Sequence, residues 1–212
     1  MKNYKKNFEI LKKNNIYSEE MEHDACGVGL IASTEGKKSR KIVEYGIEAL
    51  KAVWHRGAVD ADGKTGDGAG IHVEIPKDFF IEKVEVTGHT YDNSEICVGM
   101  IFLPRNDYAA QESCKTIVES ELTKNDFSIY GWRQVPVNPK VLGEKAFQTM
   151  PEIIQVLFKS NNPELLNKDL ERKIYETRRI IENKAFQISL NNFYICSLSS
   201  KSIIYKGMFL AE

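Results

Sequence analysis

Apolar residues recur along this chain with helical spacing in some segments and with strand-like spacing in others. Residues 39–54 place Val43, Ile47, Leu50 and Trp54 on one helical face, beside a second apolar stripe. Such a wide apolar surface predicts a helix that is well covered, for example by a sheet. Apolar residues at helical spacing predict a helix over residues 107–123, and a segment rich in charge pairs predicts another over 165–184.

Short apolar or alternating runs between polar residues predict the strands. Residues 153–158 are a short apolar run after Pro151, with no element assigned to them. The predicted strands are residues 26–33, 70–76, 95–103, 127–137, 193–198 and 202–206. The last two are separated by a short polar turn, which predicts a hairpin. Mixed elements with several adjacent strands favour an α+β fold built as a layered sandwich.

Composition and charge narrow the classes of function. The chain has 212 residues, with 29 Lys and Arg against 30 Asp and Glu, so its formal net charge is −1. A nucleic-acid-binding protein shows a basic excess, and none is present. No apolar run approaches the roughly 18 to 20 residues of a membrane-spanning helix. We therefore expect neither nucleic acid nor membrane as a partner.

Cysteine usage indicates a reducing compartment. Cys26, Cys97, Cys114 and Cys196 are far apart and form no Cys-x-x-Cys pair, and the four histidines show no metal-ligand spacing. The pattern therefore predicts neither a disulfide framework nor a metal site. Residues 1–25 lack the continuous apolar stretch of roughly 7 to 15 residues that a secretory signal needs, which predicts a cytoplasmic location.

The change of composition at Cys26 allows two interpretations of residues 1–25. They are either a frayed terminus before the first strand, or a removable leader that exposes Cys26 as a new N-terminus. An α-amine has a pKa of about 7.7 to 8.0 and a thiol about 8.5, so the amine of Cys26 would accept the thiol proton near neutrality. Cys26 would then supply both nucleophile and base.

Two further segments are candidates for a site. His55-Arg56-Gly57 ends the helix predicted over 39–54; it is either an ordinary helix end or a way of placing the charge of Arg56 near a thiolate. Residues 65–70 (TGDGAG) make either a simple turn or a loop against a substrate. Residues 58–65 fit a loose phosphate-loop pattern, but a helix precedes them and two aspartates would repel phosphate.

The order of these motifs resembles a known family. The matching segments are HDACGVGLIA at 23–32, GIEALKAVWHRGAVDADGKTGDGAGIHVEIPKDFF at 46–80, GWRxVPV at 131–137, LGxxA at 142–146, PxIxQ at 151–155 and SLSSxxIxYKGM at 197–208. Together they resemble the amino-terminal glutaminase domain of glutamate synthase large subunits. That domain is a class II glutamine amidotransferase of the N-terminal nucleophile hydrolase superfamily.

The resemblance implies a four-layer αββα sandwich, with residues 1–25 as a propeptide and 26–212 as part of the amidotransferase domain. Cys26 matches the nucleophile, which attacks L-glutamine and forms a glutamyl thioester. Arg56 and Gly57 match the family's supporting His-Arg-Gly segment. In the complete enzyme the released ammonia serves glutamate biosynthesis from 2-oxoglutarate on synthase domains, with FMN, an iron–sulfur cluster and an electron-supplying small subunit. This chain itself is expected to hold no cofactor.

The sequence also departs from the family pattern. It contains no Asn-Gly pair, which the family uses for its oxyanion hole, and it lacks the family's Arg segment for the glutamine α-carboxylate. We therefore expect the main substrate-binding groups beyond Glu212, a fold incomplete at its C-terminal end, and little glutaminase activity from the isolated chain. Two alternatives stay open: a non-catalytic domain that acts through a partner subunit, and a different amidohydrolase of the same superfamily.

Overall fold

The structure is a computed structural model that describes residues 2–14, 27–54, 57–208 and 210. Its helices are α1 (Lys2–Lys13), α2 (Arg40–Ala52), α3 (Lys77–Val86), α4 (Tyr108–Lys124), α5 (Glu144–Thr149) and α6 (Asn167–Gln187). Its strands are β1 (Ala69–Glu74), β2 (Ile96–Leu103), β3 (Phe127–Gln134), β4 (Glu152–Ser160), β5 (Tyr194–Ser199) and β6 (Ser202–Gly207). The predicted α+β class is confirmed.

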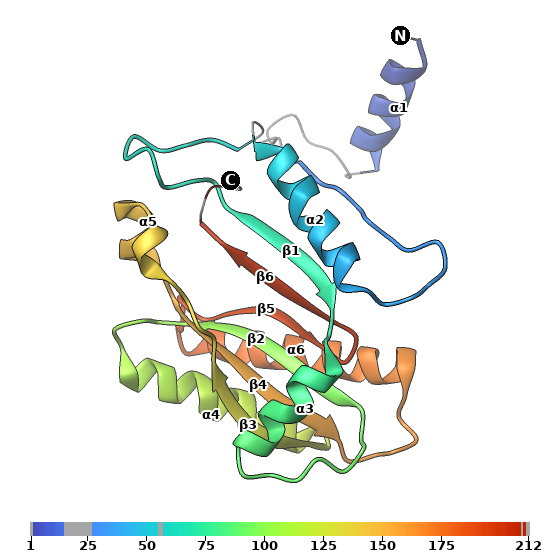
Figure 1. The fold of residues 1–212 in the computed structure, drawn as a ribbon, viewed down its shortest axis with the longest axis vertical. Coiled ribbons are helices and arrows are strands. Elements are labelled where there is room, and N and C mark those ends of the chain that lie inside the picture. Colours follow the sequence, from blue (N-terminus) through green and yellow to red (C-terminus); the bar gives the residue numbers. More distant parts are fainter. Residues whose placement is uncertain (1, 15–26, 55–56, 209, 211–212) are drawn as a thin grey trace.

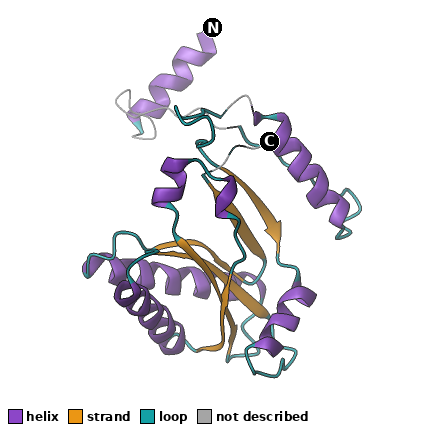
Figure 2. Ribbon diagram, turned by 60° about the vertical axis from the view of Figure 1, so that its left-hand side comes forward, coloured by secondary structure: helices purple, strands orange, loops and turns teal. Residues whose placement is uncertain are grey.

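Two antiparallel sheets lie between helices (Figures 1 and 2). One sheet has the strand order β3-β4-β2-β5, and the other is the pair β1-β6. Helices α4 and α6 lie on the outer side of the four-stranded sheet, and α2 lies against β1. The layers of the described part thus follow the αββα order that the family resemblance implies.

The larger apolar cluster lies between the four-stranded sheet and its helices. Phe127 and Phe158 meet edge to face in it, with ring centroids 5.4 Å apart. Helix α4 begins where the sequence predicts, because Asp107 caps it: its side chain accepts a hydrogen bond from the N–H of Ala110 at 2.9 Å. Helices α4 and α6 and the four-stranded sheet therefore form this half of the molecule.

A second apolar cluster lies on the opposite face of the same sheet. It includes Ile96, Val98 and Met100 of β2, Ile203 of β6 and Phe80 of α3. Seven of the eight residues of β2 are buried, because the strand is covered on both faces. This explains why β2 is a continuous apolar run in the sequence rather than an alternating one.

The strand predicted over residues 26–33 is wrong where it can be checked. Cys26 lies outside the described residues, and residues 27–33, which are described, form no strand. Val28 is 91% exposed and Leu30 is 89% exposed. The apolar run has no hydrogen-bonded partner strand within the described chain, and an unpaired run does not make a stable strand.

The predicted hairpin of the last two strands is also wrong. The strands form, but β5 pairs with β2 in one sheet and β6 pairs with β1 in the other. Glu171 of α6 holds the chain where it changes sheet, because its carboxylate accepts hydrogen bonds from Ser199 Oγ at 2.9 Å and from both the N–H and Oγ of Ser200 at 2.7 Å. The polar turn thus bonds to a helix instead of closing a hairpin.

The helix predicted over 39–54 forms as α2, with Ser39 as its N-cap, but its predicted cover is wrong. Over the described length of α2 no residue is buried. A two-stranded sheet is too narrow to cover a wide helical face, although a Cβ added at Gly46 would lie only 3.4 Å from Ile71 Cδ1 of β1. The sequence does not predict helices α1, α3 and α5, since each is short or carries few apolar residues. Strand β4 forms where the sequence shows only a short apolar run at 153–158.

Candidate functional site

Of the predicted catalytic residues, only Gly57 is among the described residues. Cys26 and Arg56 lie outside them, so their catalytic roles stay predictions. The N–H of Gly57 donates a hydrogen bond to the carbonyl of Trp54 at 3.0 Å, as expected of a residue just past a helix end. From Gly57 the chain runs through residues 57–68, which we call the 57–68 loop, into β1.

The 57–68 loop is braced by its own backbone. Asp60 N–H donates to Thr65 O at 2.8 Å, and Val59 and Gly66 form an isolated antiparallel bridge. At the base of the loop, Ala58 N–H donates to Asp67 Oδ2 at 2.8 Å. A loop closed at both its base and its tip presents Gly57 in one defined position.

Asp62 organises the tip of the loop. Its Oδ1 accepts hydrogen bonds from the N–H of Thr65 at 2.7 Å and of Lys64 at 2.9 Å, and its Oδ2 accepts from Thr65 Oγ1 at 2.6 Å. The hydroxyl of Thr65, followed by these backbone N–H groups, lowers the pKa of Asp62 well below its ordinary value. The carboxylate is therefore ionised at neutral pH.

The glycines of the segment at 65–70 bring the loop against β6. Gly68 has a φ of +114°, and a Cβ there would lie 3.1 Å from the carbonyl of Gly207. At Gly70 a Cβ would come within 2.8 Å of Tyr205 O. Gly68 is required because its backbone is left-handed, and Gly70 is required because the backbone of β6 approaches it closely. The segment at 65–70 therefore contacts β6.

The aspartates of the loop bind protein donors. Asp60 pairs with Lys145 Nζ at 2.5 Å, Asp62 accepts from Thr65, and Asp67 accepts from Ala58. Within the described ranges no group of three or more His, Cys, Asp or Glu is placed to hold a metal ion. The loop leads into strand β1 and not into a helix, so it also lacks the helix N-terminus of a phosphate loop.

Sequence reasoning missed the contacts that fix this loop. Thr65 is 3% exposed, and its hydroxyl accepts a hydrogen bond from the N–H of Ala146 in α5 at 3.3 Å. Two more residues take part in this contact between the loop and α5: Lys145 pairs with Asp60, and Gly143 lies directly against Thr65. The available signals were the Asp62-x-x-Thr65 spacing and the LGxxA segment at 142–146, but nothing in the sequence pairs the two.

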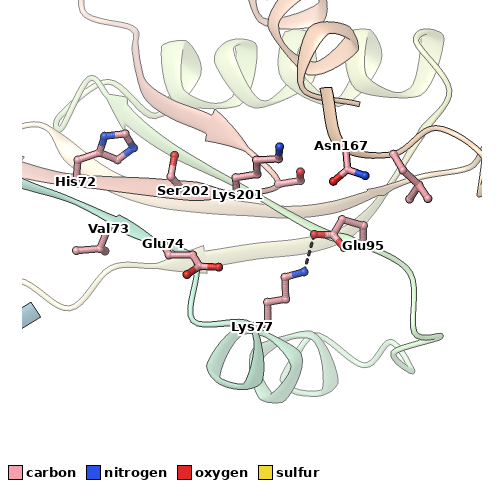
Figure 3. A pocket seen from close by; sticks show the side chains of 10 residues that line it. His72, Val73, Glu74, Lys77, Glu95, Asn167, Lys201 and Ser202 are labelled. Atoms are coloured by element: carbon pink, nitrogen blue, oxygen red, sulfur yellow. Dashed lines mark hydrogen bonds and ion pairs between the residues drawn. The ribbon is translucent and has the colours of Figure 1, made fainter. Parts of the chain in front are cut away.

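A groove lies at the other end of the β1-β6 pair (Figure 3). Its volume is about 670 Å³, and it is lined by His72, Val73, Glu74, Lys77, Glu95, Leu166, Asn167, Ser200, Lys201 and Ser202. Glu74 pairs with Ser202 at this end of the sheet, whereas Ala69 pairs with Gly207 at the end where the 57–68 loop enters. The groove is therefore not formed by Gly57 or its loop.

The three described cysteines are poor nucleophiles. Cys97, Cys114 and Cys196 are all buried. Burial raises the pKa of each thiol, to about 11 for Cys114. A buried thiol that stays protonated at neutral pH does not attack a substrate.

A sequence profile described as glutamine amidotransferases class-II matches residues 26–212. "Glutamate synthase [NADPH] large chain" of Azospirillum brasilense is 54% identical over 209 residues, which are 99% of this chain and 14% of that protein.

"Ferredoxin-dependent glutamate synthase 2, chloroplastic" of Arabidopsis thaliana is 38% identical over 209 residues, covering 97% of this chain and 13% of the relative. "Ferredoxin-dependent glutamate synthase" of Pyropia yezoensis is 40% identical over 207 residues, covering 94% and 13%. The chain thus spans about one seventh of the length of these relatives. Separately, no helix in the described parts of the chain is long and apolar enough to cross a membrane.

Proposed function

Because this chain belongs to the class-II glutamine amidotransferases, we propose that it is the glutaminase part of a glutamate synthase large chain, with Cys26 as its nucleophile. The observation that carries the proposal is where the family match begins. It starts at Cys26, the residue that the sequence singles out on chemical grounds. Residues 1–25 precede the matched domain, which supports their role as a removable leader.

The proposed reaction needs one residue for both nucleophile and base. After removal of residues 1–25, the α-amine of Cys26 takes the thiol proton, and the thiolate attacks the side-chain amide carbon of L-glutamine. The C–N bond breaks, ammonia leaves with the proton, and a glutamyl thioester remains. Water then cleaves the thioester, releases glutamate and restores the thiol. The three described thiols are buried, which supports the assignment of this role to Cys26.

Arg56 and Gly57 are proposed to support the nucleophile. A guanidinium beside the thiolate stabilises the charged form and lowers the pKa of the thiol. Gly57 contributes a small residue at the start of a braced loop, so that the chain after Arg56 follows one path. We do not assign substrate-binding side chains within 26–212.

The wider setting of the reaction is also a proposal. We propose that ammonia passes to synthase domains that add it to 2-oxoglutarate, and that a small subunit or ferredoxin supplies electrons in the cytoplasm. FMN and the iron–sulfur cluster used by the family are assigned to those domains, because four scattered cysteines do not supply a cluster motif.

The 212-residue chain alone is proposed to hydrolyse glutamine slowly. Its sequence has no Asn-Gly pair for the family's oxyanion hole. Losing one oxyanion donor costs about 100- to 1,000-fold in rate. An ammonia-release assay on the purified chain should therefore show turnover near background, and turnover typical of a complete glutaminase would contradict this.

A chimera tests the proposed function directly. Residues 1–212 replace the matching 209-residue segment of the Azospirillum brasilense large chain, and ammonia release from glutamine is measured with N-terminal sequencing. We expect an active protein that begins at Cys26, and loss of ammonia release with Cys26→Ser. An active chimera that keeps residues 1–25, or one that is unaffected by Cys26→Ser, would refute the proposal.

The alternative functions make different predictions for the same chimera. A non-catalytic domain would release no ammonia and would not react with an electrophilic glutamine analogue. A different amidohydrolase of the superfamily would be active on another amide but spared by that analogue. Labelling of Cys26 by the analogue, mapped by mass spectrometry, distinguishes both from a glutaminase.

A further inference from the structure

Helix α5 lacks a capping side chain of its own. Its N-cap residue is Gly143, which has no side chain to accept a hydrogen bond from the first turn. Helices normally satisfy one such N–H, that of the second or third helical residue, with an oxygen of Ser, Thr, Asp or Asn at the N-cap. In α5 the third helical residue is Ala146, and its N–H donates to Thr65 Oγ1 at 3.3 Å. A residue of the 57–68 loop thus supplies the missing cap.

Gly143 and the loop fit each other closely. A Cβ added at Gly143 would overlap Asp62 Oδ2 and Thr65 Oγ1, and it would lie 2.5 Å from the backbone nitrogen of Thr65. The Asp62 carboxylate and the Thr65 hydroxyl therefore occupy the space that an ordinary N-cap side chain would fill. Backbone polar groups of Lys145 also contribute to lowering the pKa of Asp62, as expected for a carboxylate at a helix N-terminus.

A further contact extends the same interface. Lys145 Nζ lies 2.5 Å from Asp60 Oδ2. The neighbouring carboxylate, that of Asp62, accepts a hydrogen bond from the Thr65 hydroxyl within the loop. The ion pair is largely exposed and contributes little on its own. The buried Thr65 hydroxyl is the central group, because it donates to Asp62 and accepts from Ala146 at the same time.

We propose that Asp62 and Thr65 are positioning residues of the amidotransferase site: they cap α5 from outside and so fix the 57–68 loop and the Gly57 end of the His-Arg-Gly segment. The inference rests on the proposed function for its catalytic meaning. The capping itself follows from the contacts of Thr65, Gly143 and Ala146. Asp62 acts through Thr65, and neither residue is assigned a contact with substrate.

Matched threonine variants test the cap in the full 212-residue chain. Thr65→Val keeps the size of the side chain but removes the hydroxyl, and Thr65→Ser keeps the hydroxyl. Thr149→Val is the control, since Thr149 lies at the other end of the same helix and its hydroxyl bonds to carbonyls of its own turn. Amide hydrogen exchange of residues 58–67 and 144–149 is measured by mass spectrometry.

Thr65→Val should speed exchange in residues 58–67 by about tenfold, because the loop loses its anchor. Thr65→Ser should stay within about twofold of the parent chain, and so should Thr149→Val in the same residues. Gly143→Ala provides a second test if Thr65→Val does not fold, since its added Cβ displaces the loop while every hydroxyl is kept. Equal exchange in Thr65→Val, Thr65→Ser and the parent would overturn the inference.

The positioning role has its own readout. Alkylation of Cys26 by iodoacetamide at pH 7 should slow by about threefold in Thr65→Val and recover in Thr65→Ser, because a displaced loop moves the charge of Arg56. Faster loop exchange with an unchanged Cys26 rate would overturn the positioning role. Failure of the proposed function is detected separately, as a chimera whose ammonia release does not depend on Cys26.

Discussion

The four-stranded sheet and the β1-β6 pair are stabilised by different kinds of contact. The four-stranded sheet is covered by α4 and α6 over an apolar cluster in which most side chains are fully buried. The β1-β6 pair is flanked by α2, in whose described residues no side chain is buried. Its inner face shares the second apolar cluster through Ile203. Its outer contacts are polar and exposed, such as Lys38 with Glu74 at 2.6 Å.

The region that contributes most of the buried apolar area is not the region that holds the predicted site residue. Burial of apolar area stabilises the first region, and its loss is costly at each position. Exposed ion pairs are weak individually, so the outer side of the second region depends on several small contacts. The predicted site residue Gly57 and its loop belong to the second region. The loop that leads from Gly57 is thus held mainly by hydrogen bonds rather than by buried apolar area.

The largest expected effect is in the first region. Phe158→Ala should lower the free energy of unfolding by about 3 to 5 kcal/mol, since Phe158 is fully buried and packs against Phe127. Tyr45→Ala in α2 is the matched change in the second region. Tyr45 is 43% exposed, so we expect less than about 1 kcal/mol. Urea unfolding measures both, and equal losses would erase the distinction between the regions.

Thiol reactivity tests how tightly the first region is closed at neutral pH. At pH 7 a thiol with a pKa of about 11, as for Cys114, has about 300-fold less thiolate than an unperturbed one of about 8.5. Burial slows it further. Brief iodoacetamide treatment of the native chain, followed by peptide mapping, should therefore modify Cys26 and spare the three described cysteines. Early modification of Cys114 would show that the first region opens readily.

Glu171 tests the connection between the regions. Glu171→Ala should cost about 1.5 to 3 kcal/mol, because it leaves the buried polar groups of Ser199 and Ser200 without their charged acceptor. Glu176→Ala, on an exposed face of the same helix, is the control and should change little. Thermal unfolding of the two variants measures the loss of stability in each. Equal losses would contradict the proposed role of Glu171 at the sheet change.

The smallest expected effect is a pH dependence. Hydrogen bonding to Lys184 and then Lys124 lowers the pKa of buried Glu121 below its usual 4.5. The stabilisation is therefore complete above about pH 5 and is lost as pH falls through the lowered pKa. We expect Glu121→Gln to reduce stability by about 1 kcal/mol at pH 7, since both lysines are partly exposed. Unfolding free energies from pH 7 to pH 3 should converge for parent and variant; a constant gap would contradict the ion pair.

Local sequence was sufficient for most elements because their determinants are local. Ser39 and Asp107 cap their own helices, and β2 is apolar on both faces because it is central. The assignment of β5 and β6 to different sheets was not predictable from their alternation. It depends on Glu171, which lies 28 positions before Ser199 and has no local signature of this role.

The distinction between local and distant contacts also explains which parts of the site the sequence predicts and which it misses. Cys26, Arg56 and Gly57 follow from motifs that are contiguous in the sequence, and of these the structure describes Gly57. Asp62 and Thr65 act through α5, and Thr65 meets Ala146 81 positions away. A threonine that caps a distant helix resembles any turn threonine until the two segments are brought together.

The pairing of β1 with β6 sets the order in which the nascent chain can fold. Ala69 pairs with Gly207, 138 positions later (207 − 69), and the strands of the four-stranded sheet are all synthesised before β6. At typical translation rates β1 waits about 7 to 28 seconds for its partner. During that interval both of its edges are open to other strands. Ribosome pausing between residues 74 and 202 is therefore expected to promote aggregation more than pausing after residue 207.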